Sequence, residues 1–71
     1  MTNKEIAQEL GYNGDPDELV YAINEIVEEA TEPMPSIDEM LNKGMIVVSD
    51  DCVEVYYEDG SWCNGAYLEN E

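Results

Sequence analysis

The stretch MIVVSDDCVEVYY, residues 45–57, decides the fold of this chain. Before it, apolar residues recur every three or four positions, whereas within it they follow a period of two and are mostly β-branched or aromatic. The pattern predicts strands over residues 45–49, 52–57 and 62–68. Asp59-Gly60 is a strong two-residue hairpin signal, and Asp50-Asp51 is a weaker one. The C-terminal part is therefore expected to be a three-stranded antiparallel meander.

Two-residue turns at both places would fix the pairing of the strands. The expected pairs are Ile46 with Val55, Val48 with Val53, Val53 with Ala66 and Tyr57 with Trp62. These residues share one side of the sheet, which the rest of the chain should cover. The other side receives Met45, Val47, Cys52, Glu54, Tyr56, Cys63 and Tyr67. Because that side is mixed in character, we expect it to be partly exposed and available to a partner.

The same register separates the two cysteines. Cys52 lies opposite Tyr67 and Cys63 lies opposite Tyr56, which puts the sulfurs several residues apart along the ladder. A disulfide needs Cα atoms within about 7 Å. We therefore expect two free thiols.

Three helices are predicted before the sheet, each from its capping residues. Thr2 with Glu5 and Ser36 with Glu39 fit the capping box, and Asp15 before Pro16 is a third N-cap. The helices are expected over residues 3–10, 16–31 and 37–42. The second helix gathers its apolar side chains on one face: Leu19, Ile23, Ile26, Val27 and Ala30. The fold class is α+β, with three N-terminal helices packed on one face of a three-stranded antiparallel β-meander, in a single domain of residues 1–71.

The charge of the chain is its best clue to function. Eighteen residues are Asp or Glu and two are Lys, so the formal net charge is −16, with no histidine. Hydrophobic residues make up 44% of the chain, which is too many for a disordered segment. We therefore expect a folded core with the carboxylates on its surface, where they repel one another. Three explanations are open: imitation of a polyphosphate, adaptation to high salt, or a cation site.

Several function classes lack their usual residues. Without His there is no Ser-His or Cys-His dyad, and two Lys without Arg offer little to an oxyanion or a phosphate, so we expect no enzyme and no cofactor. No window fits an EF-hand loop, and the acids of 13–17 and 50–51 are explained by a helix cap and a turn, so no metal is expected.

No segment has the length of a signal peptide or a membrane span, which favours a cytoplasmic protein. The negative surface argues against direct binding of nucleic acid or anionic lipid.

The segment Pro35-Ser36-Ile37-Asp38-Glu39-Met40-Leu41 resembles the Asp-Ser-Leu-Asp site at which acyl carrier proteins receive phosphopantetheine. In this chain a proline stands where that family has an acid, and a strand follows where the family continues a long helix. Ser36 is better explained as an N-cap.

The acids of the second helix are spaced for a different role. Side chains three or four residues apart on a helix lie about 5–6 Å from one another, on the order of the spacing of successive phosphates. Glu18, Glu25, Glu29 and Glu32 are the predicted principal contacts of such a phosphate-like row. Supporting contacts are expected from Asp15, Asp17, Glu28, Asp50, Asp51, Glu58 and Asp59. An ordinary solvated helix face would explain one acidic stripe, but it does not explain why so little Lys accompanies it.

In size, acidity and lack of catalytic motifs the whole chain resembles the small DNA-mimicking inhibitors of phages and mobile elements, the anti-CRISPR and antirestriction proteins. The resemblance implies a monomer that occupies the basic nucleic-acid-binding site of a host defence complex, with a CRISPR-Cas surveillance complex as the candidate partner. Two other classes stay open. One is an adaptor or antitoxin-like module that docks through its outer sheet face, and the other is a housekeeping domain of a halophile.

Overall fold

The computed structural model describes residues 1–68, which form three helices followed by three strands. Helix α1 spans Asn3–Leu10, α2 spans Pro16–Glu29 and α3 spans Ile37–Lys43. Strand β1 spans Ile46–Ser49, β2 spans Cys52–Tyr56 and β3 spans Trp62–Tyr67. The order across the sheet is β1-β2-β3, with both pairs antiparallel. The predicted α+β class and the predicted meander are confirmed.

The helices begin where the capping residues predict. Thr2 and Glu5 form a complete capping box, in which Thr2 Oγ1 accepts the Glu5 N–H over 3.2 Å and Thr2 N–H donates to Glu5 Oε1 over 2.9 Å. Asp15 Oδ1 accepts the Asp17 N–H over 3.0 Å at the start of α2. Ser36 Oγ accepts the Glu39 N–H over 3.3 Å, which is the hydroxyl half of the predicted box at α3. The start of each helix is thus marked by a local capping interaction.

Helix α2 ends two residues earlier than predicted. Its last residue is Glu29, and the Thr31 N–H donates to the Tyr57 hydroxyl over 3.3 Å instead of continuing the helix. This tertiary hydrogen bond comes from the second hairpin and has no signature in the local sequence. Glu32, predicted to be the last member of the phosphate-like row, therefore lies in the connection between α2 and α3.

The register in the middle of the sheet is confirmed, although one of the two turns is not as predicted. Ile46 pairs with Val55, Val48 with Val53, Val53 with Ala66, and Cys52 with Tyr67. The second hairpin, however, has a three-residue loop, because the Gly60 N–H donates to the Tyr57 C=O over 2.9 Å and the Tyr57 N–H donates to the Ser61 C=O over 2.8 Å. Gly60 has φ 92°, the left-handed conformation that this type of loop requires.

A β-bulge in β3 compensates for the longer loop. Val55 pairs with Asn64 while Tyr56 pairs with Trp62, so Cys63 is an extra residue on β3. The expected pairs of Tyr57 with Trp62 and of Cys63 with Tyr56 are therefore wrong. Beyond the bulge the register returns to the predicted one.

The bulge and the loop before β1 also change which side chains face the helices. Trp62 was expected on the covered side, but it pairs with Tyr56 on the open side and is 55% exposed. Cys63 was expected on the open side, but it packs against the core. Met45 was also expected there, yet it is buried, because it precedes β1 and its N–H donates to the Met40 C=O directly after the turn at Gly44.

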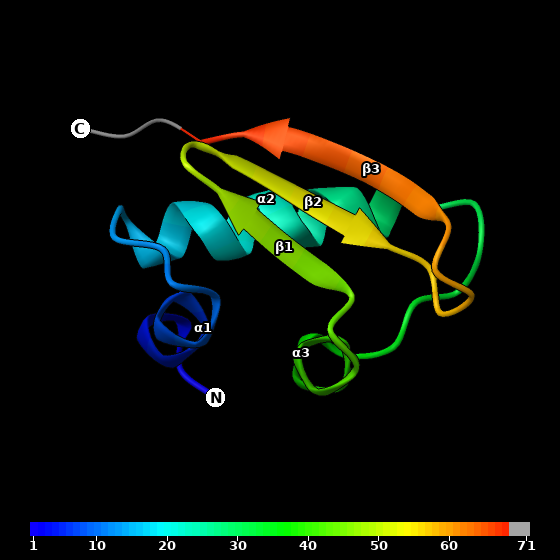
Figure 1. Ribbon diagram of the computed structural model, residues 1–71, viewed down its shortest axis with the longest axis horizontal. Coiled ribbons are helices and arrows are strands. Elements are labelled where there is room, and N and C mark those ends of the chain that lie inside the picture. The colour runs from blue at the N-terminus through cyan, green and yellow to red at the C-terminus, as the bar shows by residue number, and fades with distance from the viewer. Residues whose placement is uncertain (69–71) are drawn as a thin grey trace.

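The core lies between the helices and one face of the sheet. Helix α2 crosses that face behind β2 and β3, α1 contacts β1, and α3 adds the fully buried Met40 (Figure 1). The largest fully buried side chains are Leu19, Ile23, Met40, Val53 and Val55. The opposite face of the sheet is covered by no other element of residues 1–68 (Figure 1). Helix α2 is thus held rigidly by its inner side and presents its outer side beside β3.

Candidate functional site

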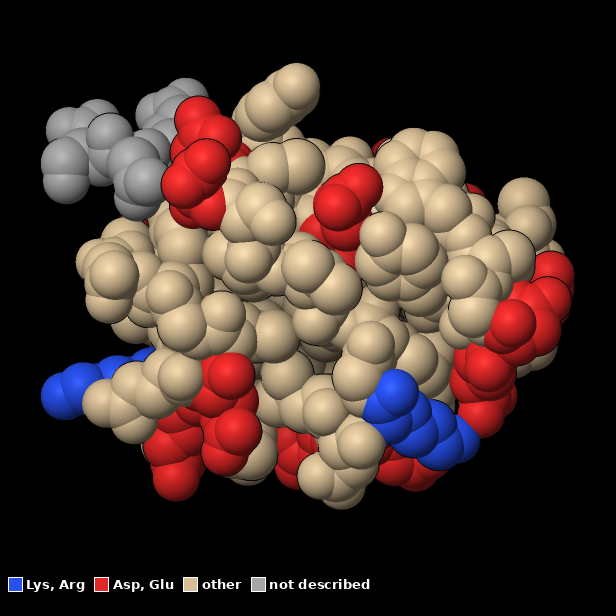
Figure 2. All heavy atoms as spheres, in the orientation of Figure 1, with Lys and Arg blue, Asp and Glu red and all other residues tan. Residues whose placement is uncertain are grey.

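The carboxylates of residues 1–68 lie at the surface of the molecule. No charged side chain is buried within residues 1–68. On the face shown in Figure 2 the acidic groups stand mainly around the rim, whereas the middle of the sheet is largely uncharged. Because the chain has eighteen acids and two lysines, most carboxylates have no basic side chain of their own chain to pair with.

Three of the four predicted principal contacts meet at one groove. A groove of about 300 Å³ runs between α2 and β3. Its helical side is formed by Glu18, Tyr21, Ala22, Glu25, Ile26 and Glu29, and its strand side is formed by residues 64–68. We call the carboxylates of Glu18, Glu25 and Glu29 the acidic row. Successive members are seven and four residues apart, so they share one side of α2 and extend over about 16 Å of helix.

Tyr21 stands within the acidic row and was missed by the sequence analysis. Its side chain is 67% exposed. A hydrogen bond with the Glu25 carboxylate, reinforced by the charges of Glu25 and Glu28, raises the pKa of the Tyr21 hydroxyl. Its position four residues before Glu25 was a usable signal, because such a spacing brings two helical side chains together.

A second set of predicted residues meets at the start of α2. Tyr12 is buried there, and burial together with the nearby charges of Glu18, Asp15 and Asp51 raises the pKa of its hydroxyl. Asp51 belongs to the β1–β2 turn, so the fold brings this turn to the end of the acidic row, a proximity that chain order does not reveal. Asp50, its neighbour in the turn, is exposed and has φ 51°.

Two of these acids also have structural partners. Asp15 caps α2, and Asp17 Oδ1 accepts a hydrogen bond from Asn3 Nδ2 over 2.9 Å. Both side chains are exposed, so they add charge beside the acidic row while they hold the junction of α1 and α2.

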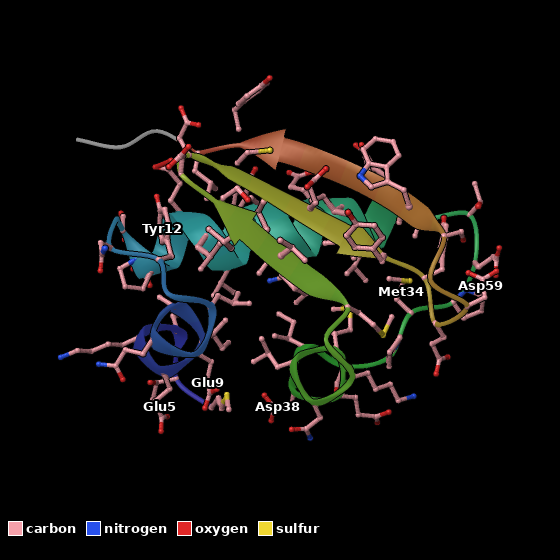
Figure 3. All side chains as sticks on the ribbon, viewed as in Figure 1. Glu5, Glu9, Tyr12, Met34, Asp38 and Asp59 are labelled. Carbon is pink, nitrogen blue, oxygen red and sulfur yellow. The ribbon has the colours of Figure 1, made fainter. Side chains whose placement is uncertain are left out.

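The remaining predicted contacts are not brought to the groove. Glu28 is exposed on α2 but does not line it, and Glu32 lies beyond the helix. Glu58 and Asp59 lie in the hairpin at the far end of the sheet, and Figure 3 shows Asp59 at the opposite end of the molecule from Tyr12. Asp59 Oδ1 accepts hydrogen bonds from the hydroxyl and the N–H of Ser61, which lower the pKa of its carboxyl.

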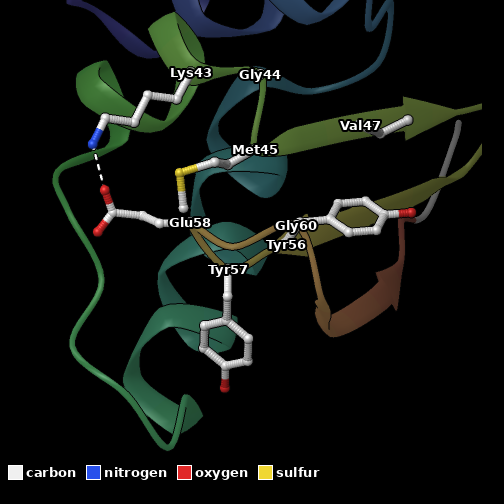
Figure 4. Close-up of a pocket in the computed structure, with 8 residues that line it drawn as sticks. All are labelled: Lys43, Gly44, Met45, Val47, Tyr56, Tyr57, Glu58 and Gly60. Carbon is white, nitrogen blue, oxygen red and sulfur yellow. Dashed lines mark hydrogen bonds and ion pairs between the residues drawn. The ribbon is translucent and has the colours of Figure 1, made fainter.

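A larger hollow of about 680 Å³ lies between α3 and the second hairpin (Figure 4). The Lys43 ammonium donates to the Glu58 carboxylate there, and this interaction raises the pKa of Lys43. Met45, Val47 and Tyr56 form the apolar part of the lining. The charges of Lys43 and Glu58 neutralise each other. This hollow therefore lacks the uniformly negative potential of the groove beside α2.

The open face of the sheet carries exposed apolar and aromatic side chains. Val47 is 41%, Trp62 55% and Tyr67 86% exposed. Trp62 was missed as a surface residue because the bulge that turns it outward arises from the length of the hairpin loop. Met45, predicted for this face, is not available to a partner.

In the described part of the chain the cysteines and acids form neither a disulfide nor a recognisable metal site. Cys52 and Cys63 are free thiols, as predicted. Within residues 1–68 no cluster of three or more His, Cys, Asp or Glu side chains is placed to hold a metal ion. The helices of the same residues are all too short or too polar to cross a membrane.

Comparisons with known protein families, with curated proteins and with solved structures give no match to this chain.

Proposed function

We propose that this protein is a non-catalytic inhibitor that imitates the phosphates of DNA and occupies the basic nucleic-acid-binding site of a host defence complex, with a CRISPR-Cas effector as the leading candidate. The observation that carries the proposal is the acidic row. Glu18, Glu25 and Glu29 follow one side of α2, and Asp15 and Asp51 extend the negative surface at its N-terminal end.

The rigidity of α2 supports this use. Leu19 and Ile23 are fully buried and Ile26 is 3% exposed, so the inner side of the helix is locked into the core. The backbone positions that carry the carboxylates are therefore held at fixed spacings, and a partner does not have to order the helix when it binds. A channel that binds DNA presents Lys and Arg side chains to phosphates, which carry no sequence information, so a rigid acidic surface can compete for it without imitating bases.

The test is a charge reversal at two positions of the acidic row. In the variant Glu25→Lys/Glu29→Lys, attraction to a basic site is replaced by repulsion, and affinity for the target complex should fall by at least about a hundredfold, on the order of 3 kcal/mol. The matched control is Glu9→Lys/Glu39→Lys, which makes the same change of charge at exposed positions of α1 and α3. The control should keep most of its inhibitory activity.

Competition with DNA completes the test. An excess of target duplex should displace the wild-type protein from the effector, and both binding and inhibition should weaken steeply as salt is added. A ternary complex of effector, DNA and inhibitor would overturn the proposal. So would a folded Glu25→Lys/Glu29→Lys variant that inhibits as well as the wild type.

The exposed aromatic residues favour a second candidate, an adaptor that docks through the open face of the sheet. Trp62 and Tyr67 are residues typical of protein interfaces, and both are largely exposed. Binding of this kind should tolerate salt and should be lost in Trp62→Ala/Tyr67→Ala while Glu25→Lys/Glu29→Lys retains it.

A further inference from the structure

Strand β3 is an open edge, which the bulge at Cys63 interrupts only near its start. It is the last strand of the sheet, and no other element of residues 1–68 lies beside its outer edge (Figure 1). Edge strands of natural proteins are commonly shortened, charged, bulged or interrupted by proline, which prevents pairing with another chain. β3 has six residues, WCNGAY, and none of them is charged or a proline. The absence of charge stands out because eighteen residues of the chain are acidic. The part of β3 after the bulge, residues 64–67, therefore remains able to pair with another strand.

The backbone groups that point away from β2 can be assigned. The Leu68 N–H donates to the Asp51 C=O, so the backbone of residue 68 faces β2. Because the direction alternates along a strand, the backbone groups of Gly65 and Tyr67 face outward. The Gly65 N–H is held by the side chain of its own neighbour, Asn64 Oδ1, over 2.8 Å. An incoming strand would displace the Asn64 side chain from the Gly65 N–H. It would also meet the N–H and C=O of Tyr67.

The groove beside this edge determines the chemistry of the occupant. A strand added to β3 would lie about 4.8 Å from it, and alternate side chains of the added strand would face α2. There they would meet the acidic row, with Glu18, Glu25 and Glu29 on the opposite wall of the groove. Side chains on one face of a strand repeat every 6.6–6.8 Å or so, and the part of β3 after the bulge extends over about 13 Å, which is comparable with the roughly 16 Å of the acidic row.

We propose that the edge of β3 captures an extended segment of the partner by strand addition, and that this segment carries Lys or Arg at alternate positions, directed at the acidic row. The proposal deepens the proposed function and rests on it for the basic character of the partner. A second copy of this chain is the competing occupant. Pairing β3 with β3 would bring two acidic rows and two chains of charge −16 together, so charge complementarity selects the basic segment.

The probe is a nine-residue peptide of alternating Lys and Thr, blocked at both ends. It should bind the wild-type protein at low salt and slow the hydrogen exchange of the Tyr67 amide. Two further peptides keep the charge but carry N-methyl groups, one at every Lys and the other at every Thr. In an added strand the groups that face β3 come from one of these two sets, so one methylated peptide should bind at least about tenfold more weakly than the parent.

The peptide that fails also reports the orientation of the added strand. With the Lys side chains directed at α2, methylation at Thr blocks an antiparallel addition and methylation at Lys blocks a parallel one. Equal binding of all three peptides would overturn the proposal, because charge alone would then account for the affinity.

Variants of the protein test the two walls of the groove separately. Glu25→Gln/Glu29→Gln should weaken binding of the parent peptide about tenfold at low salt, whereas Glu28→Gln/Glu32→Gln, which removes the same charge outside the groove, should change it little. Tyr67→Pro removes an outward N–H and should weaken binding more than Tyr67→Ala. Equal effects of the two glutamine variants would contradict the proposal, and so would formation of a wild-type dimer that Tyr67→Pro abolishes.

Failure of this inference is distinguishable from failure of the proposed function. If the peptide does not bind but the protein still competes with duplex for the effector, strand addition is wrong and DNA mimicry stands. If inhibitor and DNA bind the effector together, DNA mimicry is wrong whatever the peptide does.

Discussion

The indole ring of Trp62 lies against the backbone of Gly65 on the open face of the sheet. A Cβ placed on Gly65 would stand 3.6 Å from Trp62 Cζ2 and 3.2 Å from the carbonyl oxygen of Val53. The ring covers a stretch of strand that has no side chain of its own, an arrangement known to support glycines in sheets. The bulge at Cys63 places Trp62 on the same face as Gly65 and so makes the contact possible.

A side chain at position 65 should therefore be destabilising. Gly65→Val should lower the free energy of unfolding by about 1–3 kcal/mol, because the Val53 carbonyl belongs to the central strand and cannot give way. Gly65→Ala should cost less. The measurement is urea unfolding followed by the fluorescence of the single Trp, which should shift to the red in Gly65→Val as the ring is displaced. In a Trp62→Ala background, followed by circular dichroism, the same substitution should cost less, and an unchanged cost would show that Trp62 is not part of the contact.

Salt should stabilise the fold. The carboxylates repel one another, and the Debye length falls from about 30 Å at 0.01 M to about 3 Å at 1 M ionic strength. The melting temperature should rise over this range, and it should rise less in Glu25→Lys/Glu29→Lys, which has a smaller net charge. A melting temperature independent of salt would contradict the argument, whereas unfolding at low salt with refolding in molar KCl would favour a halophile's domain.

The Tyr12 hydroxyl should be dispensable for stability. It is buried and has no hydrogen-bond partner within residues 1–68, so Tyr12→Phe should leave the free energy of unfolding unchanged or raise it by up to about 1 kcal/mol at neutral pH. The control is Tyr21→Phe at an exposed position. A loss of more than about 1 kcal/mol in Tyr12→Phe would reveal a partner for the hydroxyl.

The same variant should alter the response to alkali. The folded protein raises the pKa of Tyr12 above its ordinary value of 10.0, chiefly through burial. A raised pKa means that the neutral hydroxyl carries no ionisation cost below pH 10, whereas the folded state loses stability relative to the unfolded chain as the pH rises towards and through the folded value. The wild type should therefore lose stability above pH 10 more steeply than Tyr12→Phe, as measured by urea unfolding across that range.

Both cysteines should react as free thiols. Denatured protein prepared without reductant should react with two equivalents of maleimide. In the native protein Cys52 should react first, because it lies on the open face of the sheet, whereas Cys63 packs against the core. Cys52→Ser should remove the faster phase, and a faster reaction at Cys63 would contradict the assignment of the two faces.

Local signals predicted most of the fold. The caps at Thr2 and Asp15 and the change of period before Ile46 are short-range features, and each marks an element where it begins. The errors have two sources. After the last turn of α2 the Thr31 N–H donates to the Tyr57 hydroxyl, and no pattern within the helix announces that bond. The pairing errors come from the loop of the second hairpin, which is one residue longer than Asp59-Gly60 indicated.

The candidate site could be predicted in part for the same reason. Glu18, Glu25 and Glu29 lie on one side of α2 because helical spacing determines their relation. The approach of Asp51 to the end of the acidic row depends on how the first hairpin packs against the junction of α1 and α2. The strand wall of the groove depends on the tertiary placement of β3, so the sequence offered no signal for it.

The paired irregularities of the second hairpin constrain how this chain can change length. The loop of Glu58–Gly60 is one residue longer than a two-residue turn, and Cys63 takes up the difference before the ladder reaches Asn64. If one residue were deleted from the loop alone, the extra residue at the bulge would no longer be compensated. Side chains of β3 would then exchange between the inward and the outward face of the sheet. In evolutionary terms, insertions and deletions in this hairpin should occur as coupled events, one in the loop and one at position 63, with each compensating for the other.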